Sequence, residues 1–142
     1  MDKKKVIFLC RGNSARSQMA EALLRKHSGD KFEVHSAGLE PTEIHPFTRK
    51  VIKEAGISLE GQRAKSLKEY LGRERFHYVI FVCGKVKKDC PATFPGVGES
   101  LFWDVEDPVD FEGTDKEKLA KFREVRDDVE RRIKEWIAGL HL

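Results

Sequence analysis

The residues with the clearest chemical potential in this sequence are its three cysteines, Cys10, Cys83 and Cys90. A cysteine acts as a nucleophile through its thiolate, so its surroundings decide its reactivity. An odd number of cysteines argues against a disulfide framework and favours reactive thiols. The spacing also lacks the close cysteine pair and further ligands that a structural zinc site needs. We therefore predict thiol chemistry, with Cys10 as its centre because an arginine, Arg16, follows in the same short loop.

The stretch from Cys10 to Ser17 predicts a loop that binds a tetrahedral oxyanion. A loop that leads into a helix aims its backbone amides at one point, and the helix dipole adds positive potential there. Gly12 and Asn13 are expected to adopt positive φ angles and curl the loop. Arg16 supplies a planar, two-pronged donor, and the Ser17 hydroxyl is expected to donate to the sulfur, so the thiolate is favoured. The predicted oxyanion-binding residues are Arg11, Gly12, Asn13, Ser14, Ala15, Arg16 and Ser17.

Alternating strand and helix patterns must position this loop. Apolar runs predict strands over residues 6–9, 32–36, 78–82 and 101–103. Helical patterns cover residues 14–26, 46–56 and 114–140, with a short turn at 67–71. This alternation predicts an α/β three-layer sandwich around a four-stranded parallel sheet with right-handed crossovers. Active sites of such sheets lie beyond the carboxyl ends of the strands, where both Cys10 and Cys83 fall.

Length and charge narrow the class of protein further. A chain of 142 residues fits a single domain, residues 1–142. No apolar run approaches the roughly 20 residues that cross a bilayer, and the apolar stretch after the basic N-terminus is too short for a signal peptide. The net charge of +3 is a small difference between 27 basic and 24 acidic residues, without a concentrated basic face. We expect a cytoplasmic monomer that binds neither nucleic acid nor membrane.

The segment FLCRGNSARSQMAE resembles the phosphate-binding loop of the low-molecular-weight protein tyrosine phosphatase superfamily, which includes thioredoxin-coupled arsenate reductases. The resemblance spans essentially the whole chain, through HSAGLEP at residues 35–41, the block at 78–91 and the Asp107–Pro108 pair. It implies that Cys10 is the nucleophile and that Asp107 is the general acid. The acid is needed because an oxygen leaves the central atom more easily once it is protonated.

The segment VCGKVKKDCP resembles the redox segment of the arsenate reductases, and Gln18 stands where phosphatases commonly carry proline. The resemblance therefore implies reduction of arsenate through a covalent Cys10 adduct and a Cys10–Cys83–Cys90 thiol relay, regenerated by thioredoxin. Phosphate and sulfate are expected to compete for the loop, and no cofactor is expected. A disulfide needs Cα atoms within about 7 Å, whereas a helix holds residues seven apart at roughly 10 Å. We therefore expect residues 84–90 to rearrange during turnover.

Two alternatives stay open from the sequence. One is a low-molecular-weight protein tyrosine phosphatase that hydrolyses phosphomonoesters through a Cys10 phosphoenzyme, with Arg16 and Asp107 in unchanged roles. The other is a non-catalytic oxyanion-binding or redox-sensing protein, against which the presence of both Asp107 and Cys90 speaks.

Two positions depart from the reductase pattern. Many thioredoxin-coupled reductases carry a further cysteine where this chain has Ala15, but that cysteine is not part of the relay, so the chemistry should survive. Some relatives bind potassium through residues matching Asn13, Glu21 and Ser36, with an aspartate at the position of Lys65. An ammonium group there would repel a cation, so we expect no metal.

Overall fold

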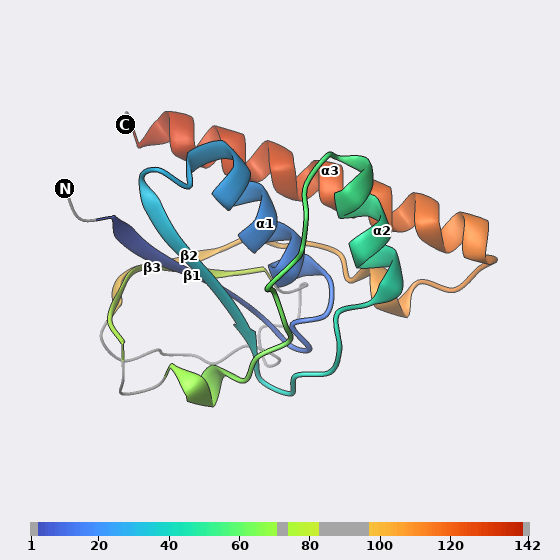
Figure 1. Ribbon diagram of the computed structural model, residues 1–142, viewed down its shortest axis with the longest axis horizontal. Coiled ribbons are helices and arrows are strands. Elements are labelled where there is room, and N and C mark those ends of the chain that lie inside the picture. The colour runs from blue at the N-terminus through green and yellow to red at the C-terminus, as the bar shows by residue number, and fades with distance from the viewer. Residues whose placement is uncertain (1–2, 71–73, 83–96, 141–142) are drawn as a thin grey trace.

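The computed structural model describes residues 3–70, 74–82 and 97–140 (Figure 1). Its centre is a four-stranded sheet in the order β2-β1-β3-β4, and every pair of neighbours is parallel. The strands are β1 (Lys4–Cys10), β2 (Phe32–Gly38), β3 (Phe76–Phe81) and β4 (Val97–Phe102). The predicted α/β class and the four-stranded parallel sheet are confirmed.

The helices α1 (Arg16–Ser28), α2 (Pro46–Glu54) and α3 (Asp115–Gly139) gather on one side of the sheet in Figure 1. Their apolar faces join the alternate β1 residues Val6, Phe8 and Cys10 in one buried cluster. The predicted capping box starts α3, because Thr114 Oγ1 accepts from the Glu117 amide at 3.2 Å and Glu117 Oε1 accepts from the Thr114 amide at 3.1 Å. This side of the molecule holds the larger core.

The opposite face of the sheet carries a smaller apolar cluster. The other β1 residues, Ile7 and Leu9, point into it with Phe81, and they pack against Leu67 of the short helix η1 (Leu67–Glu69). Because successive side chains of a strand point to opposite faces, a strand that is buried on both faces must be apolar throughout. That requirement explains the continuous apolar run of residues 6–9.

The boundaries of most elements differ from the prediction by a few residues, and two of these differences have a clear physical reason. Strand β4 begins at Val97, four residues before the predicted start. It lies at the end of the described sheet order, and its residues 98–100 are exposed. An exposed strand at the sheet edge needs no apolar pattern, so its polar half gave no signal. Helix α1 begins at Arg16 rather than at residue 14, because Ala15 has non-helical angles of φ −132° and ψ −76°.

The parallel register brings the carboxyl ends of the strands to one edge. Cys10 pairs with Gly38 of β2, and Leu9 pairs with Phe81 of β3. Cys83, Cys90 and the intervening stretch that we expect to rearrange lie outside the described residues. Within the part of the chain that is described, none of the helices has the length and apolar character needed to traverse a lipid bilayer.

Candidate oxyanion site around Cys10

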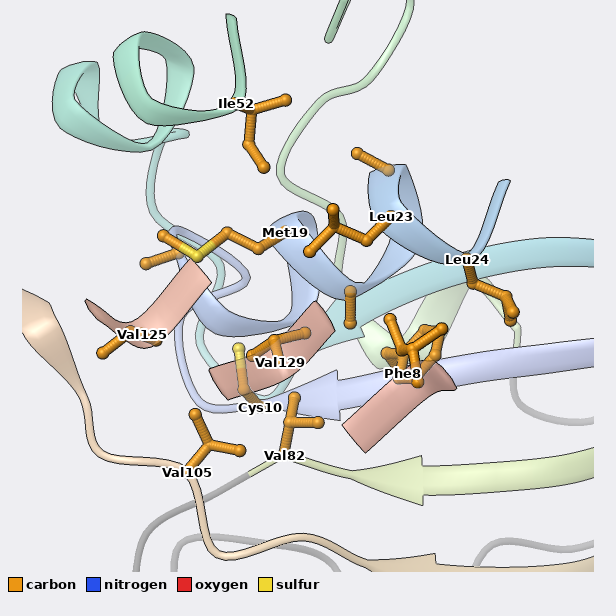
Figure 2. Close-up of a cluster of buried hydrophobic side chains, with 14 of the residues drawn as sticks. Phe8, Cys10, Met19, Leu23, Leu24, Ile52, Val82, Val105, Val125 and Val129 are labelled. Atoms are coloured by element: carbon orange, nitrogen blue, oxygen red, sulfur yellow. The ribbon is translucent and has the colours of Figure 1, made fainter. Parts of the chain in front are cut away.

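Cys10 ends β1 on the helix side of the sheet, and only 4% of it is exposed. Figure 2 shows its sulfur beside the apolar side chains of Val82, Val105 and Val129. Two polar groups reach the sulfur: the Asn13 amide donates to it at 3.3 Å, and the Ser17 hydroxyl lies at hydrogen-bond distance, 2.8 Å. The predicted contact between Ser17 and the Cys10 sulfur is confirmed.

The carbonyl groups of the loop are held by the segment that follows β2. The Cys10, Arg11 and Gly12 carbonyls accept from the amides of residues 39, 40 and 42, at 3.3, 2.9 and 3.0 Å. The Ser14 carbonyl accepts from the His45 amide at 3.1 Å. In a trans peptide the carbonyl and the next N–H point in opposite directions. The amides of residues 11, 12, 13 and 15 therefore turn away from this segment, and the Asn13 amide shows that the side they turn to is the side of the sulfur.

Only one of the two residues expected to curl the loop has a positive φ. Asn13 has φ 50°, the left-handed conformation that asparagine tolerates. Gly12 does not have a positive φ, so that expectation was wrong. A Cβ at Gly12 would make ordinary contacts only, the nearest with the Thr42 hydroxyl at 3.4 Å, so the space around this residue does not require glycine either.

Gly38 is a structural requirement of the site that the sequence analysis did not identify. A Cβ at this position would lie 2.6 Å from the Arg11 carbonyl oxygen and 2.9 Å from the Asn13 amide nitrogen. Both distances are too short for a side chain, so any other residue would push the loop away from β2. The signal was present as the glycine at the end of the HSAG segment, opposite Cys10 in the sheet register.

The Asn13 side chain ties the loop to the interior and is fully buried. Its amide group donates to Ser17 Oγ at 2.7 Å and to Ser36 Oγ at 3.0 Å. Its carbonyl oxygen accepts from Gln18 Nε2 at 2.9 Å and from the Lys65 backbone amide at 2.8 Å. Every polar atom of this side chain is thus used, so its orientation is fixed.

Lys65 and Glu21 meet behind this network. Lys65 Nζ lies 3.3 Å from Glu21 Oε1 and donates to the Arg63 carbonyl at 3.0 Å. The same Glu21 oxygen accepts from Ser36 Oγ at 2.5 Å, and the other oxygen accepts from Arg25 at 2.6 Å. The Lys65 ammonium group therefore supplies positive charge beside the Glu21 carboxylate.

Arg16 and Asp107 lie side by side at the edge of the site. Arg16 Nη2 is 3.3 Å from Asp107 Oδ2, and Arg16 Nη1 donates to the Val105 carbonyl at 3.3 Å. Asp107 Oδ1 accepts from the Val109 amide at 3.0 Å and so caps the short helix η3 (Pro108–Asp110). The structure thus brings Cys10, Arg16 and Asp107 to the same end of the sheet.

The other predicted loop residues lie at different depths. Arg11 extends outward, with 58% of its side chain exposed and a 3.8 Å ion pair to Glu40, so only its backbone is placed for an oxyanion. Ser14 is partly exposed, and Ala15 is buried in the apolar cluster under α1. The positions of Cys83 and Cys90 are not among those described.

His45 stands next to this edge and caps α2. Its Nδ1 accepts from the Phe47 amide at 3.0 Å, and its ring packs against Phe122 with a centroid distance of 4.7 Å. Burial lowers the pKa of His45 below its usual range, the Lys118 charge adds to that effect, and the Asp107 carboxylate opposes it. The neutral imidazole is therefore the form that this environment favours.

Comparison with known proteins identifies the relatives of the chain. The profile of the low molecular weight phosphotyrosine protein phosphatase family matches residues 5–141. An arsenate reductase of Halalkalibacterium halodurans is 43% identical over 134 residues, which cover 94% of this chain and 95% of that protein.

Solved structures give the same relationship. An arsenate reductase in the phosphate binding state has a TM-score of 0.77 at 33% identity, covering 96% of this chain and 98% of that one. A thioredoxin-dependent arsenate reductase of Corynebacterium glutamicum has a TM-score of 0.71 at 29% identity, covering 98% of this chain and 62% of that one. The predicted resemblance of the chain to this superfamily and to its arsenate reductases is confirmed. The chain belongs to the low molecular weight phosphotyrosine protein phosphatase family, and its similar members include arsenate reductases.

Proposed function

We propose that this protein reduces arsenate to arsenite with electrons from thioredoxin. The observation that carries the proposal is the environment of the buried Cys10 sulfur. The Asn13 amide and the Ser17 hydroxyl contact this sulfur, and the loop carbonyls bond to the segment after β2, which leaves the loop amides turned toward the sulfur. The similarity to arsenate reductases over most of the chain supports arsenate as the oxyanion. Phosphate and sulfate have the same tetrahedral shape, so they compete for the loop.

In the first step the Cys10 thiolate attacks the arsenic atom of arsenate. A sulfur–arsenic bond forms, and one arsenic–oxygen bond breaks. Asp107 protonates the departing oxygen, which leaves as water. The inward amides of residues 11, 12, 13 and 15, together with Arg16, balance the negative charge of the bound oxyanion.

Arg16 connects oxyanion binding to the acid. Its side chain is 8% exposed and is paired with Asp107, whose side chain is 31% exposed. An oxyanion in the loop offers Arg16 a second anionic partner and draws the guanidinium away from Asp107. The aspartate is then released from its cationic partner and can carry the proton that the leaving oxygen needs.

Two further thiols deliver the electrons. The Cys83 thiolate attacks the Cys10 sulfur, the sulfur–arsenic bond breaks, and its electron pair stays on arsenic as arsenite departs. Cys90 then attacks Cys83, which releases Cys10 and leaves a Cys83–Cys90 disulfide for thioredoxin to reduce. The proposed role of Cys83 is supported by the residue before it, because the Val82 amide donates to the carbonyl of Leu9, the neighbour of Cys10, at 2.9 Å.

The chemistry needs no resident cofactor or metal in this proposal. The thiols supply the electrons, and Asp107 supplies the proton. The Lys65 ammonium provides the positive charge next to Glu21 that potassium gives in some relatives. The proposed unit is one domain of residues 1–142 that acts as a monomer.

The test is arsenate-dependent oxidation of NADPH in the presence of thioredoxin and thioredoxin reductase. We expect turnover in the parent protein and its loss in both Cys83→Ser and Cys90→Ser. Cleavage of a small aryl phosphate should persist in those two variants, because it needs only Cys10, Arg16 and Asp107.

Cys10→Ser is the matched control, since it removes both reactions. A parent protein that cleaves the aryl phosphate rapidly but does not reduce arsenate would establish the phosphatase alternative instead. A protein that does neither, while still binding phosphate, would establish the non-catalytic alternative.

A further inference from the structure

A closed ring of hydrogen-bonded side chains lies behind the Cys10 loop. Its members are Asn13, Gln18, Gln62, Arg25, Glu21 and Ser36. Every member except Arg25 is buried, and 48% of the Arg25 side chain is exposed. The proposed mechanism assigns no role to Arg25 or Gln62, although both belong to the ring.

The direction of the ring is set first at Asn13. The Lys65 backbone amide can only donate, and it donates to the Asn13 side-chain oxygen at 2.8 Å. The Asn13 NH₂ group must therefore point the other way, toward Ser17 Oγ at 2.7 Å and Ser36 Oγ at 3.0 Å. A flipped asparagine would place its NH₂ group against a donor.

A second backbone group sets the direction at Gln18. The Arg63 carbonyl can only accept, and it accepts from Gln18 Nε2 at 2.8 Å. The same nitrogen donates to Asn13 Oδ1 at 2.9 Å. Gln18 Oε1 is then left as an acceptor, and it faces Gln62 Nε2 at 2.8 Å.

The chain of donors begins at Arg25. A guanidinium has no acceptor, so Arg25 Nη1 donates to Gln62 Oε1 at 3.0 Å. Gln62 is thereby fixed with its NH₂ group toward Gln18. Each bond from Arg25 through Gln62 and Gln18 to Asn13 thus runs in one direction, from donor to acceptor.

The far end of this chain is the nucleophile. Ser17 Oγ accepts from Asn13, so the hydroxyl proton of Ser17 is free to be donated to the Cys10 sulfur, 2.8 Å away. A thiolate can accept this hydroxyl proton, whereas a thiol brings a proton of its own into the same 2.8 Å contact. Hydrogen bonds in series polarise one another, and a cationic donor at the start strengthens each later donor.

The other branch of the ring bonds to the negatively charged Glu21 carboxylate. Asn13 also donates to Ser36, and Ser36 donates to Glu21 Oε1 at 2.5 Å. Arg25 NH2 meets the second Glu21 oxygen at 2.6 Å. The carboxylate is therefore compensated by Arg25 and Lys65 and does not oppose a second anion at Cys10.

We propose that Arg25 and Gln62 are positioning residues for Cys10, because they start a one-way hydrogen-bond chain that ends on its sulfur. This inference rests on the proposed function only in taking Cys10 as the nucleophile. It assigns to an exposed arginine on α1 a role in the ionisation of a buried thiol.

The test uses a protein in which Cys83→Ser and Cys90→Ser leave Cys10 as the single thiol. The rate of Cys10 alkylation by iodoacetamide is measured from pH 5 to pH 10. We expect Gln62→Leu, which keeps the volume but removes the three side-chain hydrogen bonds of Gln62, to slow alkylation at neutral pH by roughly threefold. At the alkaline end, where the thiol ionises in every variant, the rates should converge.

Arg25→Met should lower the neutral rate by roughly twofold, since it removes the cationic donor from a half-exposed position and keeps the later links. Arg126→Met is the matched control. Arg25 donates to the Val34 carbonyl at 3.0 Å as well as to the Glu21 carboxylate. Arg126 likewise joins a backbone carbonyl, that of Val51 at 2.9 Å, to a carboxylate, that of Glu54 at 3.3 Å, but these partners are not members of the ring. Its alkylation profile should equal that of the parent.

The outcomes separate this inference from the proposed function. Thermal unfolding first establishes that each variant is folded, and Arg25→Met serves if Gln62→Leu is not. A folded variant with the parental alkylation profile overturns the positioning role. A displaced profile supports it even if the protein with all its cysteines reduces no arsenate, which would overturn the proposed function alone.

Discussion

The proposed nucleophile, Cys10, and the proposed acid, Asp107, are held in very different ways. Asn13 and Ser17 are fully buried, and the Cys10 loop is attached to β2, α2 and residue 65 through backbone and side-chain bonds. Asp107 keeps 31% of its side chain exposed, and its bonds are those to Arg16 and to the next turn of its own segment. A fixed sulfur and a loosely held carboxylate suit a reaction in which the proton must follow a ligand that comes and goes.

Removal of the proposed acid should have the largest effect on catalysis. In Asp107→Asn we expect kcat for arsenate to fall about 10²- to 10³-fold, because an amide cannot protonate the leaving oxygen. The free energy of unfolding should change by less than about 1 kcal/mol, since the lost ion pair is partly exposed. Steady-state kinetics and urea unfolding measure the two effects.

A substitution that disturbs the Cys10 loop should instead lower the stability of the protein. Gly38→Ala places a Cβ 2.6 Å from the Arg11 carbonyl, so the loop must move and the protein should lose about 1–3 kcal/mol of stability. Gly139→Ala is the control, because a Cβ there meets nothing within 4 Å. Urea unfolding should find Gly139→Ala unchanged or slightly more stable. A Gly38→Ala protein as stable and as active as the parent would contradict the close approach of β2 and the loop.

The Lys65 ammonium group belongs to the rigid surroundings of Cys10, where it lies beside Glu21. We expect parental activity to be flat when potassium replaces sodium at constant ionic strength. Lys65→Asp should lose stability without potassium and regain up to about 1 kcal/mol when potassium is added, through binding to the folded state. Thermal unfolding in the two salts measures this effect, and a parental protein that potassium stabilises would refute it.

His45 is expected to give the smallest effect. Its folded-state pKa is lowered, chiefly by burial, so its neutral form stabilises the fold above the unfolded value of 6.5. That contribution is lost as the pH falls below 6.5 toward the folded-state pKa, because protonation then favours the unfolded chain. The variant His45→Asn keeps an N-cap acceptor for α2.

Urea unfolding at pH 7.5 and pH 5.5 tests this linkage. The drop in stability at the lower pH should be smaller in His45→Asn than in the parent by less than about 1 kcal/mol. Equal pH dependence in the two proteins would show that His45 does not titrate differently on folding.

Much of this molecule was predictable from local sequence. The apolar run before Cys10 and the run over residues 78–82 identified the two central strands, because strands buried on both faces must be apolar. The Thr114–Glu117 box located the start of α3. The polar residues 98–100 of β4 were missed because an exposed edge strand has no such constraint.

The sequence by itself determined the identity of the loop, the order of the elements and the edge of the sheet at which Cys10 lies. Those properties follow from the periodicity of burial and from residue types within a short stretch of chain. The tertiary structure alone decided that Gly38 must be small, that Lys65 meets Glu21, and that Gln62 and Arg25 connect to Asn13. These contacts join positions distant in the chain, and only the packing of α1 and of residues 62–65 around the end of the sheet makes a hydrogen bond between them possible.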